Sequence, residues 1–397
     1  MIRNDSATAY ISRFAAEQSQ FLISKSPSEW PQRKEGKLME QIKKTEGVEY
    51  PAYITESRRP QKAPDAIVKD GKSVFGAFDG PIKNLNIIDA KKPVSPLFPG
   101  FAKSLRIREW EAYEICFDEG FICGAVYDMG IAVFNVLMFY DRAAKKVVTN
   151  QIFGAPRKCV NDSLINSVNK LKTGAFKTSI DNQFQNGKVY IKADYSPKSN
   201  KKTPMAVDIV FTSCAVPSIT VMPFGENRPV YTQKEYFRAE GKIKIGDKEF
   251  AMNENSVGII DDHKGYYPLH MHYDWLTGMG ISDGKPLGFN LCKNQTQSPD
   301  KYSENLLWLN GELHLLPPVD FEHLKDGNWR VFDKFGAVDI LFEIDDAYYL
   351  TKGFGVHSTK YVAPFGVIKG FAKDLSGNKI ILDGLTGMGE DITVDYM

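Results

Sequence analysis

The sequence predicts an all-β protein whose strands form antiparallel sheets in a sandwich or barrel architecture. From about Ala66 onward, short apolar runs rich in β-branched and aromatic residues follow one another at a spacing of roughly ten residues. Turn-forming sequences such as Gln185-Asn186-Gly187 lie between the runs, and no long helical patterns alternate with them. Aromatic residues make up 12% of the chain, which favours β-structure and an apolar cavity.

The beginning of the chain differs from the rest. Residues 1–50 are polar and carry helical signals, because the apolar residues within positions 6–16 recur every three or four residues. Residues 51–64 are typical of a linker, with a proline at each end. We therefore expect a short helical appendage at residues 1–50, followed by the β-rich part of the chain.

Strand candidates occur throughout the remaining chain. Ser104–Phe117 carries bulky side chains at both sets of alternate positions, so both faces of this strand are expected to pack. Asn161–Lys172 interrupts the series and is interpreted as a short helix. The other candidates are Phe121–Asp128, Ile131–Phe139, Lys188–Tyr195, Ala206–Thr212, Ala239–Met252, Pro286–Leu291, Asn305–Leu309, Glu312–Leu315, Ala337–Glu343, Tyr361–Phe371 and Lys379–Leu382.

The length of the chain suggests two β-domains beside the appendage. At 397 residues the chain exceeds what one hydrophobic core usually organises. The second half repeats the strand pattern of the first, so we place the domains at residues 51–235 and 236–397. The pentapeptide Leu-Thr-Gly-Met-Gly occurs at 276–280 and again at 385–389, but its flanking sequences differ, so no internal repeat is inferred.

Charge and composition restrict the class of partner. The formal net charge is +1, which gives no electrostatic steering toward nucleic acid or an anionic membrane. No run reaches the ~18 apolar residues of a membrane span, and no signal-peptide core follows Met1. The 5 cysteines are scattered, which is typical of free thiols in a reducing compartment. We expect a cytoplasmic protein with a small-molecule partner, no nucleic acid and no membrane span.

Titratable and aromatic side chains are most concentrated between Asp261 and Trp275. This stretch holds three of the 6 histidines, together with three acids and three tyrosines. Alternate residues of an extended strand share a face, so His272 and Asp274 are expected on one face and Tyr273 and Trp275 on the other. If the sequence encodes a functional site, it is expected in this region.

Several motifs resemble those of a bacterial family, the domain of unknown function 2804. They follow the family's order from about residue 70 to the C-terminus, while the first 50 residues lie outside them. The family pattern has Trp-Asn-Trp where this chain has Tyr273-Asp274-Trp275. Asp274 is therefore a weaker candidate for a catalytic residue common to the family. The motifs are Phe78-Asp79-Gly80-Pro81, Asp261 with Lys264-Gly265, Tyr273-Asp274-Trp275, Gly288-Phe289-Asn290-Leu291, Glu304-Asn305, Phe365-Gly366 with Gly370, and Gly384 with Gly387 and Glu390.

This resemblance implies a fold and a class of ligand. The family is distantly similar to the group of carotenoid 1,2-hydratases and lipocalin-like cyclases, whose members are built from two lipocalin-like β-barrels side by side. It therefore implies two lipocalin-like antiparallel barrels and an apolar or amphipathic ligand of lipid, terpenoid or polyketide type. It supplies no reaction for the family itself.

The chemistry of the stretch suggests cofactor-independent hydration, cyclisation or isomerisation. Asp274 is the first candidate for the catalytic acid, with His272 as its partner and with Tyr273 and Glu304 as further catalytic candidates. Burial in an apolar cavity would raise the pKa of Asp274 to a value useful for protonating a double bond. Aromatic faces would stabilise a carbocation. The expected ligand-binding residues, in or beside the second barrel, are Tyr266, Tyr267, His270, Trp275, Asn290, Asn305, Glu390 and Asp261.

Other interpretations of these residues stay open. Polar residues at strand ends commonly satisfy backbone groups, and aromatic residues commonly fill barrel ends. The protein could therefore be a non-catalytic lipid-binding or carrier protein. A metal-dependent enzyme is a further alternative, because His270, His272 and Asp274 form a His-x-His-x-Asp pattern, although three ligands from one strand rarely converge without a fourth.

We expect neither a cofactor nor a metal ion. The sequence contains no phosphate-binding loop, no dinucleotide-binding fingerprint and no nucleophile elbow. No cysteine lies in a motif that marks it as a nucleophile. The sequence does not indicate the oligomeric state.

Overall fold

The strand pattern of the sequence becomes two large antiparallel sheets, and the all-β prediction is confirmed. The structure is a computed structural model that describes residues 50–94, 100–354 and 357–395. The predicted appendage at residues 1–50 lies outside these ranges, except for Tyr50. Within the described ranges no helix is long and apolar enough to cross a membrane.

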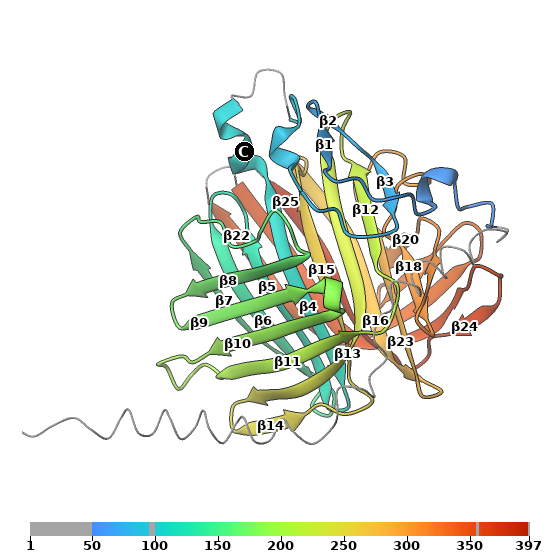
Figure 1. Ribbon diagram of the computed structural model, residues 1–397. Helices are drawn as coiled ribbons and strands as arrows, with labels where there is room; N and C mark the ends of the chain where they lie inside the picture. Colours follow the sequence, from blue (N-terminus) through green and yellow to red (C-terminus); the bar gives the residue numbers. More distant parts are fainter. Residues whose placement is uncertain (1–49, 95–99, 355–356, 396–397) are drawn as a thin grey trace, which may run out of the picture. The chain divides into compact units, whose positions relative to one another are not determined.

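The first sheet has 13 strands, which curl into a nearly closed barrel. The strands are β3 (Gly76–Phe78), β4 (Arg108–Phe117), β5 (Gly120–Asp128), β6 (Val133–Asp141), β7 (Lys146–Gly154), β8 (Asn166–Thr173), β9 (Phe176–Gln183), β10 (Lys188–Tyr195), β11 (Met205–Ser213), β12 (Ser218–Pro223), β13 (Pro229–Ile245), β14 (Lys248–Ala251) and β15 (Val257–Gly265). The main path runs β7-β6-β5-β4-β15-β13-β11-β10-β9-β8. Its end strand β8 packs back against β6 and β7, and Figure 1 shows β8 to β11 crossing in front of β4 to β7.

The second sheet has 10 strands and forms an open half-barrel. The strands are β16 (His270–Ser282), β17 (Lys285–Lys293), β18 (Leu306–Leu309), β19 (Glu312–Leu315), β20 (Asp320–His323), β21 (Trp329–Phe332), β22 (Val338–Phe354), β23 (His357–Lys373), β24 (Lys379–Ile381) and β25 (Thr386–Asp395). The order is β19-β18-β17-β16-β25-β23-β22-β21-β20, and β24 pairs with β23. All of these pairings are antiparallel.

Short elements precede the first long strand. The strands β1 (Val68–Lys69) and β2 (Lys72–Ser73) form a small separate ladder, and the 3-10 helices are η2 (Glu56–Arg58), η3 (Ile87–Asp89), η4 (Gly100–Arg106) and, later, η5 (Phe184–Asn186). The segment predicted as a linker is anchored to the second sheet, because the buried Arg58 donates hydrogen bonds to the carbonyl oxygens of Leu316 (2.5 Å) and Asn305 (3.1 Å).

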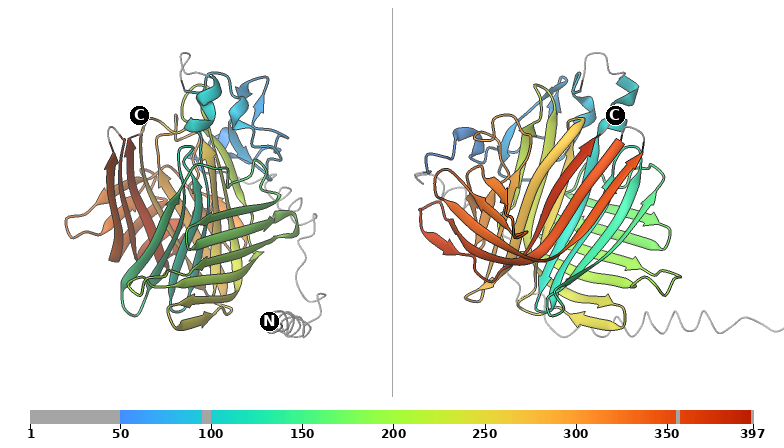
Figure 2. Two further views of the ribbon diagram at one scale, coloured as in Figure 1. Left: turned by 90° about the vertical axis from the view of Figure 1, so that its left-hand side faces the viewer. Right: turned by 180° about the vertical axis from the view of Figure 1, so that it is seen from behind.

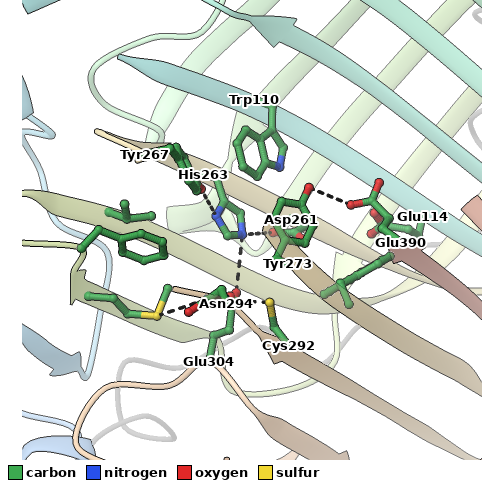
Figure 3. Close-up of a pocket in the computed structure, with 14 residues that line it drawn as sticks. Trp110, Glu114, Asp261, His263, Tyr267, Tyr273, Cys292, Asn294, Glu304 and Glu390 are labelled. Atoms are coloured by element: carbon green, nitrogen blue, oxygen red, sulfur yellow. Dashed lines mark hydrogen bonds and ion pairs between the residues drawn. The ribbon is translucent and has the colours of Figure 1, made fainter. Parts of the chain in front are cut away.

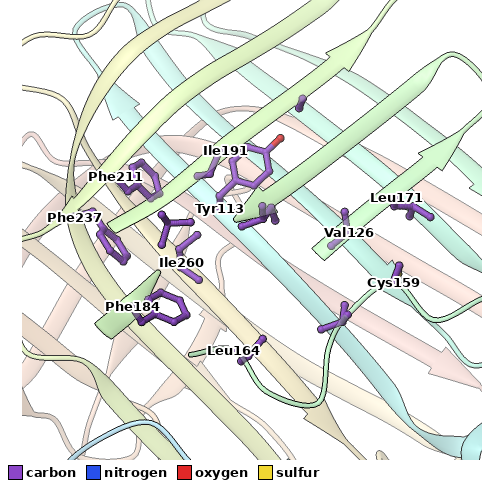
Figure 4. Close-up of a cluster of buried hydrophobic side chains, with 14 of the residues drawn as sticks. Tyr113, Val126, Cys159, Leu164, Leu171, Phe184, Ile191, Phe211, Phe237 and Ile260 are labelled. Atoms are coloured by element: carbon purple, nitrogen blue, oxygen red, sulfur yellow. The ribbon is translucent and has the colours of Figure 1, made fainter. Parts of the chain in front are cut away.

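Three buried apolar clusters separate the layers of the fold. Figure 2 shows the second sheet, strands β4 to β7, and strands β8 to β11 following one another as layers. One cluster fills the inside of the first barrel and includes Tyr113, Phe211, Phe237 and Ile260 (Figure 4). A second cluster, with Trp110, Tyr236, Trp275 and Trp308, lies between the two sheets. The third, with Leu276, Phe289, Trp329 and Phe342, covers the inner face of the half-barrel.

A pair of stacked aromatic rings joins the two sheets. Tyr236 of β13 stacks on Trp308 of β18, with ring centroids 5.3 Å apart and planes 9° from parallel. The Tyr236 hydroxyl donates to the Leu287 carbonyl oxygen (2.9 Å), and the Trp308 indole donates to the Val216 carbonyl oxygen (3.0 Å). Both rings are fully buried, so this contact bonds each sheet to the other through packing and hydrogen bonds.

A β-bulge in β22 changes which face its side chains take. The register against β23 shifts between Ile344 and Asp346. Before the bulge, Phe342 packs inside the half-barrel, whereas after it Tyr348 and Leu350 face the first sheet, although all three positions are even-numbered. At the bulge, Asp345 accepts a hydrogen bond from the Tyr140 hydroxyl (2.5 Å), so the inserted residue also ties β22 to the first sheet.

Two expectations on the organisation of the chain need adjustment. The short helix interpreted at Asn161–Lys172 is wrong, because β8 (Asn166–Thr173) alternates between exposed and buried side chains and pairs with β9 along its whole length. The two sheets divide between Gly265 and His270, whereas the predicted domain boundary lies at residues 235 and 236, inside β13. The strand β13 is continuous across that boundary, and β14 and β15 also pair in the first sheet.

A row of polar side chains crosses the interior of the first barrel. Gln233, Asp262 and Glu111 are neighbours on three adjacent strands, and Glu111 accepts hydrogen bonds from Asn169 and from Asn182 (2.6 Å). Neither carboxylate oxygen of Asp262 has a hydrogen-bond partner among the described residues. Burial, and then the charge of Glu111, raises the pKa of Asp262 well above its ordinary value. The folded protein therefore favours the protonated form of Asp262.

We predict that Asp262→Asn stabilises the protein at pH 8 by at least about 1 kcal/mol, since each unit of pKa elevation is worth about 1.4 kcal/mol. Above about pH 4 the unfolded chain releases this proton while the folded chain keeps it, so the wild type loses stability as pH rises. Below that pH the two proteins should converge. Urea unfolding at several pH values measures the effect, with the exposed Asp208→Asn as control. A destabilised Asp262→Asn protein at pH 8 would contradict the prediction.

Candidate active site between the two sheets

A small pocket with several titratable side chains in its lining lies between the sheets, where β4, β13 and β15 of the first face β16, β17 and β25 of the second (Figure 3). Its volume of about 50 Å³ suits one reacting group and a water molecule rather than a whole ligand. The pocket is lined by Trp110, Glu114, Met222, Phe224, Val230, Asp261, His263, Tyr267, Tyr273, Trp275, Cys292, Asn294, Glu304 and Glu390.

Strand alternation explains how both sheets present functional side chains to this pocket. On β15, Asp261 and His263 point into it, while Asp262 between them points into the first barrel. On β16, Tyr273 and Trp275 line it by the same period of two. The strand β15 is buried on both faces, which is why it carries bulky or charged residues at consecutive positions.

One side of the pocket holds an ion-pair cluster centred on Lys234 from β13. The Lys234 Nζ lies 2.5 Å from an Asp261 oxygen and 3.2 Å from a Glu304 oxygen, and all three side chains are buried. The His263 Nε2 lies 3.1 Å from Asp261 and 3.5 Å from Glu304. The opposite ring nitrogen of His263 lies 3.0 Å from the Tyr267 hydroxyl, so the imidazole is held from both ends.

The charges of this cluster keep its carboxylates ionised. Burial alone would raise the pKa of Asp261 and of Glu304, but the charges of Lys234 and His263 outweigh it and hold both pKa values below their ordinary range. Burial would lower the pKa of His263, yet the carboxylate of Asp261 outweighs that effect and raises it. The cluster therefore holds two carboxylates against the ammonium group of Lys234 and against a histidine whose pKa is raised.

The other side of the pocket holds two carboxyl groups whose pKa values are raised instead of lowered. Burial raises the pKa of Glu114 well above its ordinary value, and the negative charge of Asp261 adds to the effect. The Oε2 atom of Glu114 is buried and accepts no hydrogen bond from any described residue. Burial also raises the pKa of Glu390, although hydrogen bonds from Tyr361 (2.6 Å) and Tyr273 (3.0 Å) offset part of it.

Aromatic rings form the wall between these groups. Trp110 stacks on His263 with a centroid distance of 4.5 Å and on Tyr267 at 5.5 Å. The Trp275 indole donates a 2.6 Å hydrogen bond to Asn290, whose amide donates in turn to the Glu304 carbonyl oxygen. The wall is thus rigid, and it offers π-faces to any positive charge that develops in the pocket.

A larger apolar cavity of about 650 Å³ lies farther along the same interface. It is bounded by β5, β6 and β7 on one side and by β22, β23 and β25 on the other, with Phe134, Met138 and Leu350 in its lining. Tyr127 lines this cavity and stacks on Trp110 of the small pocket at 4.8 Å. Tyr361 also lines it and bonds to Glu390 of the small pocket. The two cavities therefore share a wall, and both lie between the sheets rather than inside a barrel.

Half of the residues predicted from the sequence line the small pocket, and Asn290 positions two of them. Those in the lining are Asp261, Tyr267, Tyr273, Trp275, Glu304 and Glu390. They come from β15, β16, β25 and the segments beside them, and the fold brings them together from positions up to 129 residues apart in the chain, the difference between 390 and 261.

The remaining candidates lie elsewhere. Asp274 and His272 point to the opposite face of β16, inside the half-barrel, where Asp274 contacts both His272 (3.6 Å) and His323 (3.1 Å). Tyr266 packs within the first barrel. The list is completed by His270, which is exposed and contacts Asp395 (2.7 Å), and by Asn305, which bonds to the Cys292 amide and the Pro317 carbonyl oxygen.

Sequence reasoning did not single out Lys234, His263, Glu114 or Trp110. His263 lies inside the predicted stretch, so its parity with Asp261 was a usable signal. Trp110 and Glu114 share one face of β4, which the alternation of that strand also indicates. Lys234 carries no local signal, because its role depends on two carboxylates from other strands.

Comparison with known proteins gives one family and several distant structures. The model described as domain of unknown function (DUF2804) matches residues 58–396. The crystal structure of CghA with Sch210972 is 11% identical, with 84% of this chain and 97% of that chain covered and a TM-score of 0.47. Kievitone hydratase from Nectria haematococca is 12% identical, with 80% and 98% covered and a TM-score of 0.43.

A third similar structure is the putative AttH from Nitrosomonas europaea, which is 12% identical over 74% of this chain and 93% of that chain, with a TM-score of 0.41. No curated protein matches the chain. Because all three TM-scores lie below 0.5, a functional conclusion has to come from the residues of this chain's own pocket.

Proposed function

We propose that this protein, which belongs to the DUF2804 family, binds an apolar or amphipathic small molecule between its two sheets and catalyses a proton-transfer reaction on it. The reaction class is cofactor-independent hydration, cyclisation or isomerisation. One observation carries the proposal: a single buried pocket contains carboxyl groups whose pKa values are pushed in opposite directions. Such a split separates a proton donor from a proton acceptor at one pH.

Glu114 is the proton donor in this proposal. Burial raises the pKa of its carboxyl group well above the ordinary value, which favours the protonated form, and its Oε2 atom is not occupied by another described group. A carbon–carbon double bond held in the pocket would take this proton at one carbon, which leaves positive charge on the other. The faces of Trp110 and Tyr273 and the carboxylates of the cluster would stabilise that charge.

Asp261 is the proton acceptor. It lies on the strand beside Glu114 and on the same face, diagonally across the β4–β15 ladder. In hydration, a water molecule bonds to the cationic carbon and gives a proton to Asp261. In isomerisation, a carbon next to the cation loses a proton to Asp261. In cyclisation, a second double bond of the ligand first bonds to the cationic carbon, and a carbon next to the new cation then loses the proton. Either way one proton enters from Glu114 and one leaves to Asp261, and the return of that proton to Glu114 through water completes the cycle. His263 orients Asp261 by the 3.1 Å contact.

The apolar cavity accommodates the rest of the ligand. Its volume of about 650 Å³ falls within the range of small-molecule sites, and its lining is mainly aromatic and aliphatic. Because the apolar cavity shares its wall with the small pocket, a ligand in the apolar cavity can present one end to Glu114. This arrangement supports a lipid-, terpenoid- or polyketide-like ligand with one reactive group.

The test uses the purified full chain and its Glu114→Gln variant. Organic-solvent extracts of both are analysed by mass spectrometry. We expect the variant to retain a substrate that the wild type holds as product, with the two differing by one water or, for isomerisation, by retention time alone. The recovered substrate then serves as the assay compound, and kcat of Glu114→Gln should be lower by about 10²–10⁴-fold.

Glu111→Gln is the matched control, because it also replaces a buried glutamate of β4 but on the face that points into the first barrel, away from the pocket. It should yield the wild-type product. The same unchanged compound in all three extracts would favour the carrier protein instead of the enzyme. If no extract contains an apolar compound, the proposal that the protein binds an apolar ligand is contradicted.

A further inference from the structure

Four metal-ligating side chains meet on the face of the second sheet that points away from the pocket. His272 and Asp274 come from β16 and Asp391 from β25, and one ligand atom of each lies within 4.8 Å of the others. His323 comes from β20, at the far edge of the same sheet, and contacts both carboxylates. Three separate strands therefore bring this group together.

The distances within the group are close to the spacing of ligands around a metal ion. The His272 Nε2 lies 3.6 Å from an Asp274 oxygen, and the His323 Nε2 lies 3.1 Å from the other Asp274 oxygen. The His323 Nδ1 lies 3.8 Å from Asp391. Ligands of a tetrahedral zinc ion are about 3.3 Å apart, given metal–ligand bonds of about 2.0–2.2 Å. The ligand atoms of His272, Asp274 and Asp391 would have to move closer together. The His323 ring, which meets Asp274 through Nε2 and Asp391 through Nδ1, would have to turn so that one nitrogen points at the ion.

Hydrogen bonds and stacking already orient the two imidazole rings. The His272 Nδ1–H donates to the Ile392 carbonyl oxygen (3.1 Å), which leaves Nε2 with its lone pair directed toward Asp274. Outer contacts of this kind set the tautomer of histidines that bind metal ions. The His323 ring stacks on Trp329 with a centroid distance of 4.6 Å and planes 4° from parallel.

The charge arrangement calls for a cation. Asp274 and Asp391 are direct cross-strand partners in the β16–β25 ladder. Like charges in directly opposite positions destabilise a sheet unless something neutralises them. The side chains of Asp274 and Asp391 are 11% and 32% exposed, so water screens them only in part, while His272 at 44% leaves a path for an ion from solvent.

We propose that His272, Asp274 and Asp391, with His323 as the fourth ligand, bind a divalent transition-metal ion of the zinc type. Two imidazoles and two carboxylates form a mixed donor set that suits such ions. The ligand set differs from the linear His-x-His-x-Asp pattern, because His270 is exposed and turned to Asp395 at the end of β16. The site is thus defined by the fold and not by the motif.

A metal ion here would stiffen the sheet behind the candidate active site. Tyr273 lies between His272 and Asp274 on β16, and Glu390 precedes Asp391 on β25. These two residues face the pocket and are hydrogen-bonded to each other (3.0 Å). Fixing their neighbours on the opposite face would hold that hydrogen bond in place. The proposal does not depend on the chemistry assigned to Glu114.

The experiment titrates the EDTA-treated full chain with zinc chloride in a calorimeter and follows cobalt(II) absorption as a second readout. We expect one ion per chain, a tetrahedral cobalt spectrum and a higher melting temperature with zinc. His272→Ala and Asp391→Asn should each abolish the tight site, and His323→Ala should weaken it about 10–100-fold. Circular dichroism verifies that each variant is folded.

His270→Ala is the matched control, since it removes a histidine two residues from His272 on the same strand and should leave binding unchanged. Equal loss in His270→Ala and His272→Ala would overturn the proposed ligand set. The absence of a one-to-one site in the wild type would overturn the proposal as a whole. In that case the four residues would form only an ion-pair network.

Discussion

Replacing Lys234 by methionine is expected to destabilise the protein by about 3–5 kcal/mol at neutral pH. The ammonium group is buried and lies between the carboxylates of Asp261 and Glu304. Methionine fills a similar volume but carries no charge, so two buried carboxylates lose the cation that keeps them ionised. Such an uncompensated pair costs more than the loss of an ion pair at the surface.

The pH dependence of this loss identifies its cause. In the wild type, the lowered pKa of Glu304 contributes stability above its unfolded pKa, and this contribution disappears as pH falls through the folded value. In Lys234→Met both carboxyls would bind protons more readily, so the difference from wild type should shrink toward about pH 5. Urea unfolding at several pH values measures it.

Lys145→Met serves as the control for removing an ion-paired lysine. Lys145 also pairs with a carboxylate, Asp345, at 2.8 Å, but its side chain is 67% exposed. The control should therefore unfold like the wild type. A Lys234→Met protein that loses equal stability at every pH would show that packing, and not charge, explains the loss.

Trp308→Ala is expected to cost about 3–5 kcal/mol, in the range for truncating a buried tryptophan. The indole is fully buried at the junction of the two sheets, stacked on Tyr236 and bonded to the Val216 carbonyl oxygen. Alanine would leave a cavity at this junction and an unpaired carbonyl oxygen. The two sheets would then lose the contact that joins β13 to β18.

Trp308→Phe separates the contribution of ring stacking on Tyr236 from that of the hydrogen bond to Val216. Phenylalanine keeps an aromatic ring against Tyr236 but cannot donate to Val216, so the loss should be clearly smaller than for alanine and still measurable. Denaturant unfolding of both variants gives the comparison. If Trp308→Ala loses less than about 1 kcal/mol, the stacked pair does not hold the sheets together.

The fold class was accessible from the sequence because strand patterning is local. Runs such as Lys188–Tyr195 alternate between buried and exposed residues and end at Gly or Asn turns, so each could be recognised alone. The error at Asn161–Lys172 has a physical reason: β8 is polar on its outer face, and its inward residues include Asn169, which bonds to Glu111 inside the barrel. A polar residue facing inward hides the alternation of its strand.

The candidate site was accessible only in part. Alternation correctly separates Tyr273 and Trp275 from His272 and Asp274, but parity does not tell which face looks toward the other sheet. Which face of β16 meets the first sheet depends on its packing against β4 and β15. These two strands belong to the other sheet and form no ladder with β16. Lys234 and Glu114 could not be assigned for the same reason, since their charges matter only next to Asp261.

The bulge at Asp345 decides how sequences related to this chain have to be aligned along β22. Ile344 pairs with Gly366 and Asp346 with Phe365, so Asp345 is the extra residue of β22 at this point. Without it, the pairs Tyr348–Ala363 and Leu350–Tyr361 would stay as they are, and both side chains would still face the first sheet. A relative that lacks the bulge can therefore keep the same cavity lining, although it would lose the hydrogen bond from Tyr140. An alignment of such a relative needs its one-residue gap at Asp345, because a gap placed after the cavity residues would equate cavity positions with positions inside the half-barrel.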